Sequence, residues 1–313
     1  MTLLRFLLSA CVCLSLAARE PGPASLSCGD KLCFSSGFGS GGVLQRDTRA
    51  ALYGSAPAPG CPSLTLWLNA SDGSASTRYT GATAADGTWK ILLDQQPAGG
   101  NFSVEIVCAA SGERAALHDL TFGDVWACAG QSNAWLPMWF TQERNRTTEA
   151  IARGEYKNMR LWRGGLQQTT TGPNFVVPGG PAPGSDPGEA LTNQWRRPAD
   201  LLPPNLIRDG EPWLWEYPST CFYTFQYLTD ILGADAPPFG LLSVPVGGTM
   251  LEEWASPAAQ AQCTNVTCMC FDDKAGCDPY GPLSDKCTKN SDMYFGSVQP
   301  FLNMTIRGWI WCA

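Results

Sequence analysis

The sequence is poor in histidine and in charged residues. His118 is the one histidine among 313 residues, so the composition excludes a histidine-rich metal centre and leaves a single candidate for an imidazole base. Charged residues make up 16%, and 28 acidic residues outnumber 21 basic ones. This balance argues against a protein that binds nucleic acid without sequence preference, because such a protein needs a basic face. The 33 glycines and 24 prolines favour loops and short strands over long helices.

Long apolar runs are also scarce. Residues 1–18, MTLLRFLLSACVCLSLAA, place one basic residue before a short apolar stretch that ends in small residues. The apolar part is shorter than the ~20 residues that span a bilayer, so it favours a cleaved secretory signal peptide over an uncleaved signal anchor. We therefore expect a protein of the secretory pathway, extracellular or lysosomal, with no membrane attachment after signal cleavage.

Secretion predicts glycosylation and disulfide bonds, and the sequence offers sites for both. Asn-x-Ser/Thr sequons occur at five positions, namely Asn69, Asn101, Asn145, Asn265 and Asn303. Of the 14 cysteines, two lie in the predicted signal peptide and five crowd into residues 263–287. No histidine and no C-x-x-C spacing accompanies these five, so they predict a disulfide-stapled loop in an oxidising compartment and no metal site.

The first part of the chain after the signal peptide has the pattern of a β domain. Residues 30–117 contain short strand-like runs separated by turns, and they predict a small β-sandwich-like domain. Residues 37–42 formally match G-x-G-x-x-G. They lead into a strand and not into a helix, so they indicate a flexible turn and not a dinucleotide site.

Residues 118–313 follow a different pattern, in which buried strands alternate with helices. The predicted strands cover 120–128, 159–162, 239–248 and 305–311, and the predicted helices cover 141–152 and 217–232. A Gly- and Pro-rich stretch at 164–189 predicts a surface insertion. The alternation indicates an α/β sheet, whose ligands bind at the carboxyl ends of the strands.

Ser132 lies at one of these strand ends, between Gln131 and Asn133. A serine in a tight turn before a helix can project its hydroxyl, and backbone N–H groups nearby can stabilise an oxyanion. Gly247 and Gly248 follow another strand and offer bare backbone N–H groups of the same kind. The ordinary alternative for Ser132 is a serine that caps a helix.

Three segments of this region resemble sialate O-acetylesterases, which belong to the SGNH hydrolases. Residues 123–133, GDVWACAGQSN, resemble the nucleophile block of that family. Residues 244–256, VPVGGTMLEEWAS, resemble its second block, and residues 300–311, PFLNMTIRGWIW, resemble the strand that leads into its third. The similarity extends over residues 34–313 and implies an SGNH-like three-layer α/β domain behind a small β domain.

The resemblance implies an esterase that removes O-acetyl groups from sialic acid or related sugars, without metal or cofactor. Ser132 would attack the acetyl ester and form an acyl-enzyme. The N–H groups of Ser132 and of Gly247 or Gly248 would stabilise the tetrahedral oxyanion. Gln131 and Asn133 would shape the substrate pocket.

Trp135 is the candidate for a wall of that pocket. It follows Ser132 closely, and Trp139 lies one helical turn further along. Aromatic rings in this position can stack on a sugar, although core packing is the ordinary role of a tryptophan.

The sequence departs from the family after Trp311. The family continues with Trp-Tyr-Gln-Gly-Glu-Ser-Asn, whereas this sequence ends with Cys312 and Ala313, before the Asp-x-x-His block that supplies the base. We therefore expect an incomplete α/β domain and weak or absent turnover, because a serine without a base is a weak nucleophile. His118 does not replace the base, since a strand of about ten residues puts it about 30 Å away. The alternatives are a catalytically dead secreted glycan-binding glycoprotein and a structural secreted glycoprotein.

Overall fold

The computed structural model describes residues 31–56, 60–164, 194–204, 207–208, 211–262, 291 and 293–312. Several expectations fall outside these residues. They are the signal peptide at 1–18, the insertion at 164–189 apart from Gly164, and the cysteine-rich loop at 263–287 with its sequon at Asn265. In the part of the chain that is described, no helix has the length and apolar character needed to cross a membrane.

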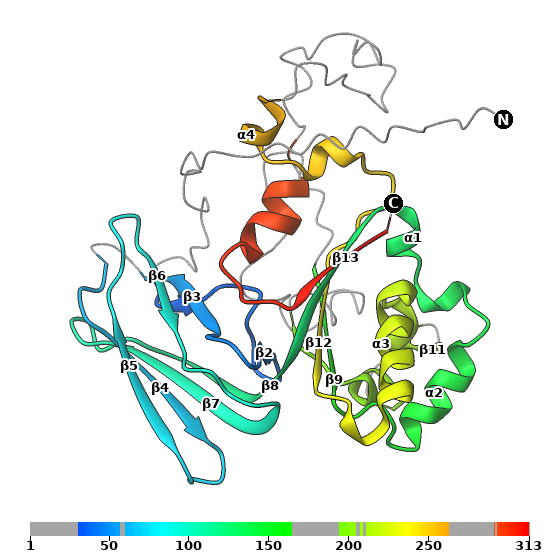
Figure 1. The fold of residues 1–313 in the computed structure, drawn as a ribbon, viewed down its shortest axis with the longest axis horizontal. Coiled ribbons are helices and arrows are strands. Elements are labelled where there is room, and N and C mark those ends of the chain that lie inside the picture. The colour runs from blue at the N-terminus through cyan, green and yellow to red at the C-terminus, as the bar shows by residue number, and fades with distance from the viewer. Residues whose placement is uncertain are drawn as a thin grey trace, which may run out of the picture.

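The amino-terminal part consists of short strands in two sheets around one core (Figure 1). The smaller sheet holds β1 (Cys33–Phe34), β3 (Ala51–Ser55) and β6 (Thr88–Leu92), and the larger one begins with β5 (Ser76–Gly81), β4 (Leu64–Ala70) and β7 (Gly99–Cys108). Alternate leucines of β4 enter the core while the residues between them face outward. A disulfide between Cys61 and Cys108 ties the start of β4 to the end of β7.

One strand of 17 residues, β8 (Arg114–Gly130), serves both halves of the chain. Its first half pairs antiparallel with β7, and its middle pairs parallel with β2 (Val43–Gln45). Its second half pairs parallel with β12 (Phe239–Ser243) on one side and β13 (Gly308–Cys312) on the other. The boundary predicted between residues 117 and 118 therefore falls inside a continuous strand.

The second half of β8 is the centre of a parallel sheet in the order β13–β8–β12–β9, where β9 is Met159–Arg163. The connection from β8 to β9 contains α1 (Ser132–Trp135), η1 (Met138–Phe140) and α2 (Arg144–Ala152). The main helix before β12 is α3 (Ser219–Leu232). Shorter elements are η3 (Pro198–Leu201), β10 (Ile207–Arg208), β11 (Glu211–Pro212), η4 (Trp213–Glu216), η5 (Gly233–Asp235), η6 (Leu251–Trp254), α4 (Pro257–Gln260), η8 (Tyr294–Val298) and η9 (Gln299–Phe301).

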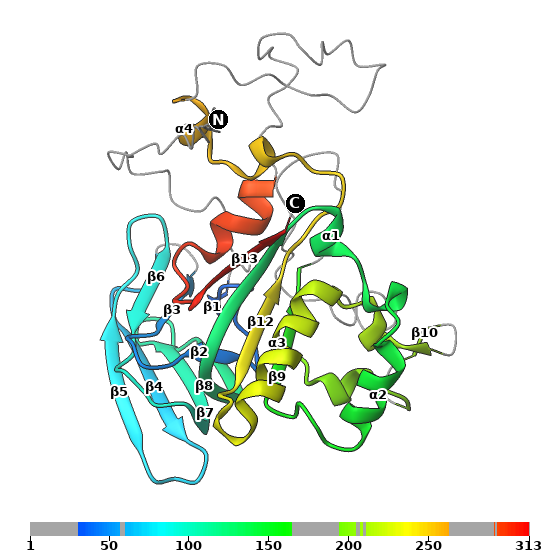
Figure 2. The same ribbon diagram turned by 45° about the vertical axis from the view of Figure 1, so that its right-hand side comes forward.

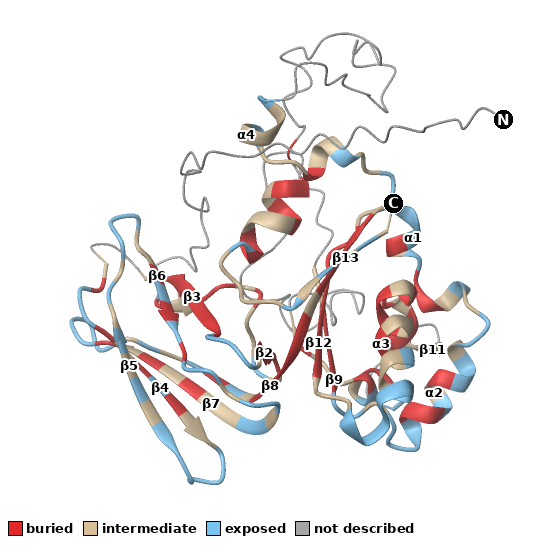
Figure 3. Cartoon of the chain, in the orientation of Figure 1, coloured by how far each residue is buried: buried red, intermediate tan, exposed pale blue. Residues whose placement is uncertain are grey.

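Helical segments cover both faces of this parallel sheet. Phe222 and Phe225 of α3 pack against one face with Leu241 of β12. The segment that contains Met293 and Phe301 packs against the other face. Figure 2 shows the two layers on opposite sides of β8 and β12, and Figure 3 shows that these strands are buried along most of their length. The predicted α/β class is confirmed.

The helix that follows Ser132 is short. α1 spans four residues and ends at Leu136, where the chain turns extended ahead of Pro137. A residue before proline is disfavoured in the helical region, so the helix stops there. The helix predicted at 141–152 forms as α2, and the helix predicted at 217–232 forms as α3.

Candidate active site

The carboxyl ends of β8, β12 and β13 meet at one edge of the parallel sheet, and Ser132 lies there. The backbone N–H of Gln131 donates to the carbonyl of Cys312 at 3.0 Å, which holds the Ser132 turn against the end of β13. Figure 1 and Figure 2 both show α1 beside that strand end. Gly130 makes the approach possible, because a Cβ at this position would lie 1.9 Å from the Cys312 carbonyl oxygen and the residue has a φ of +126°.

The Ser132 side chain is exposed and is held by its neighbour Gln131. The backbone N–H of Ser132 donates to Oε1 of Gln131 at 2.7 Å, and the Ser132 hydroxyl donates to the same oxygen. Gln131 therefore caps α1 and occupies two groups that the proposed chemistry needs. The structure brings these two predicted residues together, with Gln131 as a hydrogen-bond acceptor of the serine.

Gly247 and Gly248 lie in a loop that runs alongside α1. The N–H of Val246 donates to the carbonyl of Gly130 at 3.0 Å, which places the start of this loop next to the end of β8. A Cβ on Gly247 would lie 3.8 Å from Cε3 of Trp135, so the glycine backbone faces the indole. Both glycines are exposed, and within the described part of the chain their N–H groups donate to no backbone or side-chain acceptor.

Thr249 stabilises this glycine loop, although the sequence analysis did not single it out. Its hydroxyl donates to the carbonyl of Val246 at 2.8 Å and accepts from Nε1 of Trp254 at 3.0 Å. The pair fixes a turn around the two glycines. Its position directly after the Gly-Gly pair is the signal that could have identified it.

Two tryptophans from different segments form an aromatic corner behind this loop. The rings of Trp254 and Trp311 meet edge to face, with centroids 4.9 Å apart. Trp254 is buried, whereas Trp311 is 42% exposed. No role for Trp311 follows from the sequence, although its place at the carboxyl end of a predicted strand was a usable signal. The strand predicted as buried at 305–311 forms as β13 without a fully buried residue. Trp139 lies elsewhere, edge to face with Trp215 in the core that includes α3.

Asn133 is exposed, and its backbone links the site to α3. Its carbonyl oxygen accepts a hydrogen bond from the Thr220 hydroxyl at 2.9 Å. One residue further along α3, Cys221 forms a disulfide with Cys128 of β8. The serine turn is thus connected to α3 by a hydrogen bond and to the sheet by the strand that precedes it.

No described imidazole or carboxylate makes a hydrogen bond to the Ser132 hydroxyl. His118 is exposed near the start of β8, where its backbone bonds to Ser40 and Gly41, and Ser132 lies just past the other end of that strand. Glu253 caps η6, since its Oε2 accepts from the N–H of Met250 at 2.7 Å. Among the described residues no group of three or more His, Cys, Asp or Glu side chains could hold a metal ion.

The geometry suits an acyl transfer in part. An exposed hydroxyl, two glycine N–H groups and an indole come together at the edge of a parallel sheet where ligands usually bind. The proton acceptor is the missing component in the described part of the chain, since an amide oxygen accepts a hydrogen bond but is no base at neutral pH.

Comparison with known proteins shows what the chain is similar to. No family model matches the chain. The sialate O-acetylesterases of Homo sapiens and Pongo abelii are each 27% identical to it over 292 residues, which cover 92% of the chain. The sialate O-acetylesterase of Mus musculus is 24% identical over 291 residues. The chain is similar to sialate O-acetylesterases over most of its length. It spans about half the length of these curated relatives, 49% in each case.

A solved structure has a similar fold. A carbohydrate acetylesterase from Xanthomonas citri matches with a TM-score of 0.57 and 20% sequence identity, over 87% of this chain and 49% of that one. At this identity the likeness concerns the fold. It agrees with the α/β arrangement that places Ser132 at the end of β8.

Proposed function

We propose that Ser132 is the nucleophile of a carbohydrate O-acetylesterase site whose substrate is O-acetylated sialic acid or a related acetylated sugar. The observation that carries the proposal is the juxtaposition of the exposed Ser132 hydroxyl with the glycine loop at the meeting point of three parallel strand ends. The names of the relatives and of the structural neighbour support an ester of this class.

In the proposed reaction, Oγ of Ser132 attacks the acetyl carbonyl carbon and gives its proton to a base. The bond between that carbon and the sugar oxygen then breaks, and the sugar leaves as an alcohol after taking up a proton. Water hydrolyses the acetyl-serine to acetate and restores the hydroxyl. No metal or cofactor enters these steps.

The oxyanion would be stabilised by backbone N–H groups. Those of Gly247 and Gly248 are unoccupied among the described residues, whereas the N–H of Ser132 is bound to Gln131. The Gln131 side chain must therefore rotate away before Ser132 can contribute both its hydroxyl and its N–H. In the structure Gln131 is the hydrogen-bond partner of Ser132, and substrate would replace Gln131 in that role.

Turnover by the 313-residue chain is expected to be weak, because the described residues place no base at Ser132. A serine fluorophosphonate probe tests the nucleophile directly. Labelling should disappear in Ser132→Ala and persist in Ser74→Ala, a control that alters an exposed serine in the turn between β4 and β5. Equal labelling of the two variants would refute the nucleophile assignment, and acetate release from O-acetylated N-acetylneuraminate measures turnover separately.

Binding without hydrolysis is the second candidate function. It is favoured by the amide acceptor at Ser132, which leaves the hydroxyl unactivated. Titration of the chain with an acetylated sialoside should then give saturable binding that Ser132→Ala retains. Weak labelling together with retained binding supports this function, whereas labelling that matches acetate release supports the esterase.

We also propose passage through the secretory pathway, with glycans on some of the five sequons. Asn101 and Asn145 are exposed, and Asn69 and Asn303 are half-buried at the surface. Expression in a secreting cell, followed by intact mass measurement before and after enzymatic deglycosylation, tests both parts. An unglycosylated intracellular product would contradict the proposal.

A further inference from the structure

Arg160 is a buried cation that has no carboxylate partner in the part of the chain that the structure describes. It lies on β9 and is 8% exposed. Its Nη1 donates to the carbonyls of Lys157 at 2.9 Å and Met159 at 3.4 Å, while its Nε is buried with no hydrogen-bond partner. No ion pair among the described residues includes it. Burial of an unpaired charge is costly, so a buried arginine normally faces a counter-ion or a ligand.

Arg160 lines a cavity of about 500 Å³ on the sheet face opposite α3. Met159 and Leu161 pack into the core beneath α3, and the alternation of a strand turns Arg160 to the other side. The remaining walls come from β7 and β8 and from the segment 234–238. A volume of this size lies in the range of small-molecule sites.

The other arginines of this cavity are already neutralised. Arg46 pairs with Asp124 at 2.9 Å, and Arg197 pairs with Asp119 at 2.7 Å. Arg160 therefore supplies the uncompensated positive charge of the lining. Asp235 also lines the cavity, but it belongs to an exposed turn.

The surroundings of Arg160 raise the energy of its charged form. Burial and the nearby Arg197 lower the pKa of the Arg160 guanidinium, and Asp119 and Asp200 oppose this effect only in part. Asp119 already pairs with the Arg197 guanidinium, and Asp200 accepts from the backbone N–H of Arg197. A negatively charged ligand would supply the missing compensation.

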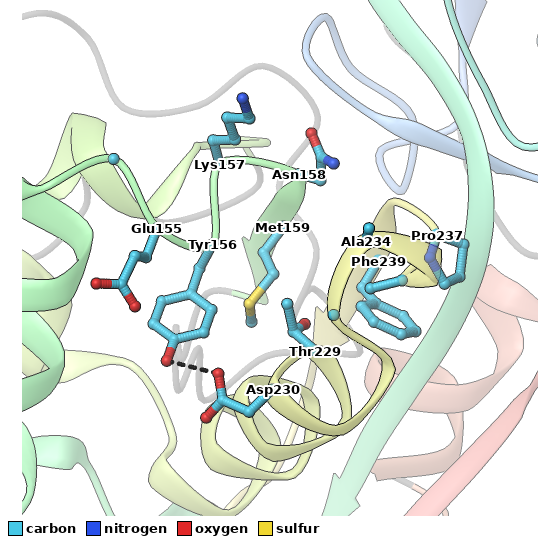
Figure 4. Close-up of a pocket in the computed structure, with 13 residues that line it drawn as sticks. Glu155, Tyr156, Lys157, Asn158, Met159, Thr229, Asp230, Ala234, Pro237 and Phe239 are labelled. Atoms are coloured by element: carbon cyan, nitrogen blue, oxygen red, sulfur yellow. Dashed lines mark hydrogen bonds between the residues drawn. The ribbon is translucent and has the colours of Figure 1, made fainter.

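A second hollow lies on the other side of the same segment, and its charged lining residues are Glu155, Lys157 and Asp230. It shares Asn158, Ala234, Ala236 and Pro237 with the Arg160 cavity. Figure 4 shows its floor, where Tyr156 bonds to Asp230, and places Asn158 away from that pair. Two carboxylates disfavour an anion in this hollow, and its lysine, Lys157, is exposed to solvent, whereas Arg160 is buried.

We propose that the Arg160 cavity binds a sugar-sized ligand that carries a carboxylate, with the Arg160 guanidinium as its counter-ion. A guanidinium presents a planar fork of donors that matches a carboxylate, and the hydroxyl of Thr121 and the amide of Asn101 provide polar groups on the same lining. Arg160 lies toward the start of β9, whereas Ser132 lies at the carboxyl ends of the strands. The site is thus distinct from the proposed ester site and does not depend on it.

Calorimetric titration with D-glucuronate tests the proposal, with D-glucose as the neutral match and inorganic phosphate as a different anion. The whole chain is used after enzymatic removal of N-glycans, so that a glycan on Asn101 does not cover the cavity. Glucuronate should bind saturably and more weakly as salt rises, and glucose should not bind. Arg160→Gln should weaken glucuronate binding at least tenfold, and Arg160→Lys should weaken it less.

Arg114→Gln is the matched control, because it removes an exposed arginine paired with Glu105 on the surface. It should leave glucuronate binding unchanged, and Ser132→Ala should do the same. Thermal denaturation of Arg160→Gln without ligand should show a melting temperature no lower than that of the parent chain, since the variant loses an unpaired buried charge. Equal binding of glucose, stronger binding of phosphate, absence of glucuronate binding, or binding unaffected by Arg160→Gln would overturn the proposal.

Discussion

Gln131 and Ser132 have the geometry of a catalytic pair without its basicity. The serine hydroxyl points at a side-chain oxygen one residue away, and the backbone N–H of the same serine bonds to that oxygen. An amide oxygen is too weak a base to take the hydroxyl proton. Whether the Ser132 hydroxyl can lose its proton therefore depends on the functional group of the side chain at position 131.

Replacing that amide by a carboxylate should activate the serine. In Gln131→Glu a carboxylate of the same shape would sit within hydrogen-bond reach of Oγ and could accept its proton. Fluorophosphonate labelling of Ser132 at pH 7 should become about tenfold faster or more. The gain should fade below about pH 4, where a glutamate of ordinary pKa becomes protonated.

Gln131→Leu serves as the control, because it frees the serine without supplying a base. Its labelling rate should stay well below that of Gln131→Glu. If the two variants label at the same rate, then release of the serine and not basicity limits its reactivity.

Individual site residues were predictable where local sequence carries the information. The turn at Ser132 and the glycines of the second loop stand out because each follows a buried strand. The bonds of Thr249 to Val246 and Trp254, and the contact of Trp311 with Trp254, were not predictable. They are side-chain contacts, and one of them joins residues far apart in the chain.

At the scale of elements, Tyr156 links the start of β9 to the end of α3. Its hydroxyl donates to Asp230 at 2.9 Å (Figure 4). Burial, with Asp230 as a further cause, raises the pKa of Tyr156 to about 12. The neutral phenol is thus favoured in the folded state, and its contribution to stability is complete below the ordinary tyrosine pKa near 10.

This contribution should be lost as the pH rises from about 10 toward 12. Tyr156→Phe should lower the free energy of unfolding by about 1 kcal/mol at pH 7, the worth of one hydrogen bond. The variant should also lose stability less steeply than the parent chain in this alkaline range. Urea unfolding at several pH values measures both effects, and Tyr227→Phe, which changes an exposed tyrosine of α3, should leave the profile as it is. An identical alkaline profile for Tyr156→Phe would contradict the assignment.

Loss of either of the two described disulfides should lower stability, but only one of them should affect the reactivity of Ser132. Each closes a long loop, with sequence separations of 93 for Cys128–Cys221 and 47 for Cys61–Cys108. Replacing either pair by alanine should lower the free energy of unfolding by about 4 kcal/mol. Removal of Cys128–Cys221 should also slow Ser132 labelling, because that bridge anchors the end of α3 that bonds to Asn133.

The pair Cys61–Cys108 is the built-in control for that experiment. It lies in the β part of the chain, so its loss should leave the labelling rate per folded molecule unchanged. Chemical denaturation and probe labelling of the two double variants separate stability from reactivity. Slower labelling in both variants would mean that the bridge acts through global stability alone.

β4, which has a buried face, was predictable, whereas β5, which has none, was missed. β4 buries every second residue near its start, so its alternating leucines predict a strand. β5 alternates between exposed and half-buried residues and has no fully buried position, so its sequence STRYTG carries no apolar period. Its strand conformation comes from pairing with β4, which is a tertiary effect.

At the scale of the whole molecule, β8 joins the two halves into one folding unit. Phe122 lies within β8 and is fully buried in the core of the β part, while the next few residues of the strand already pair with β12. The predicted boundary near residue 117 rests on a change of pattern in the sequence. Such a change does not reveal whether one strand continues across it.

A cavity in the β core should therefore weaken the α/β half as well. Phe122→Ala should lower the free energy of unfolding by about 3–5 kcal/mol, the usual cost of removing a buried phenylalanine. Tryptophan fluorescence and loss of Ser132 labelling in urea should shift together to the same lower midpoint. Two separate transitions, with labelling unaffected in the first, would show that the halves unfold independently.

The same strand also determines how the molecule would respond to mechanical load. A force applied along β8 would shear its ladders with β7 in the first half, with β2 in the middle, and with β12 and β13 in the second half. The hydrogen bonds of these ladders run across the strand, so many of them would resist the force at once. Under force the protein should therefore unfold in a single rupture event. The Ser132 turn, at the end of β8, would be under tension until that event.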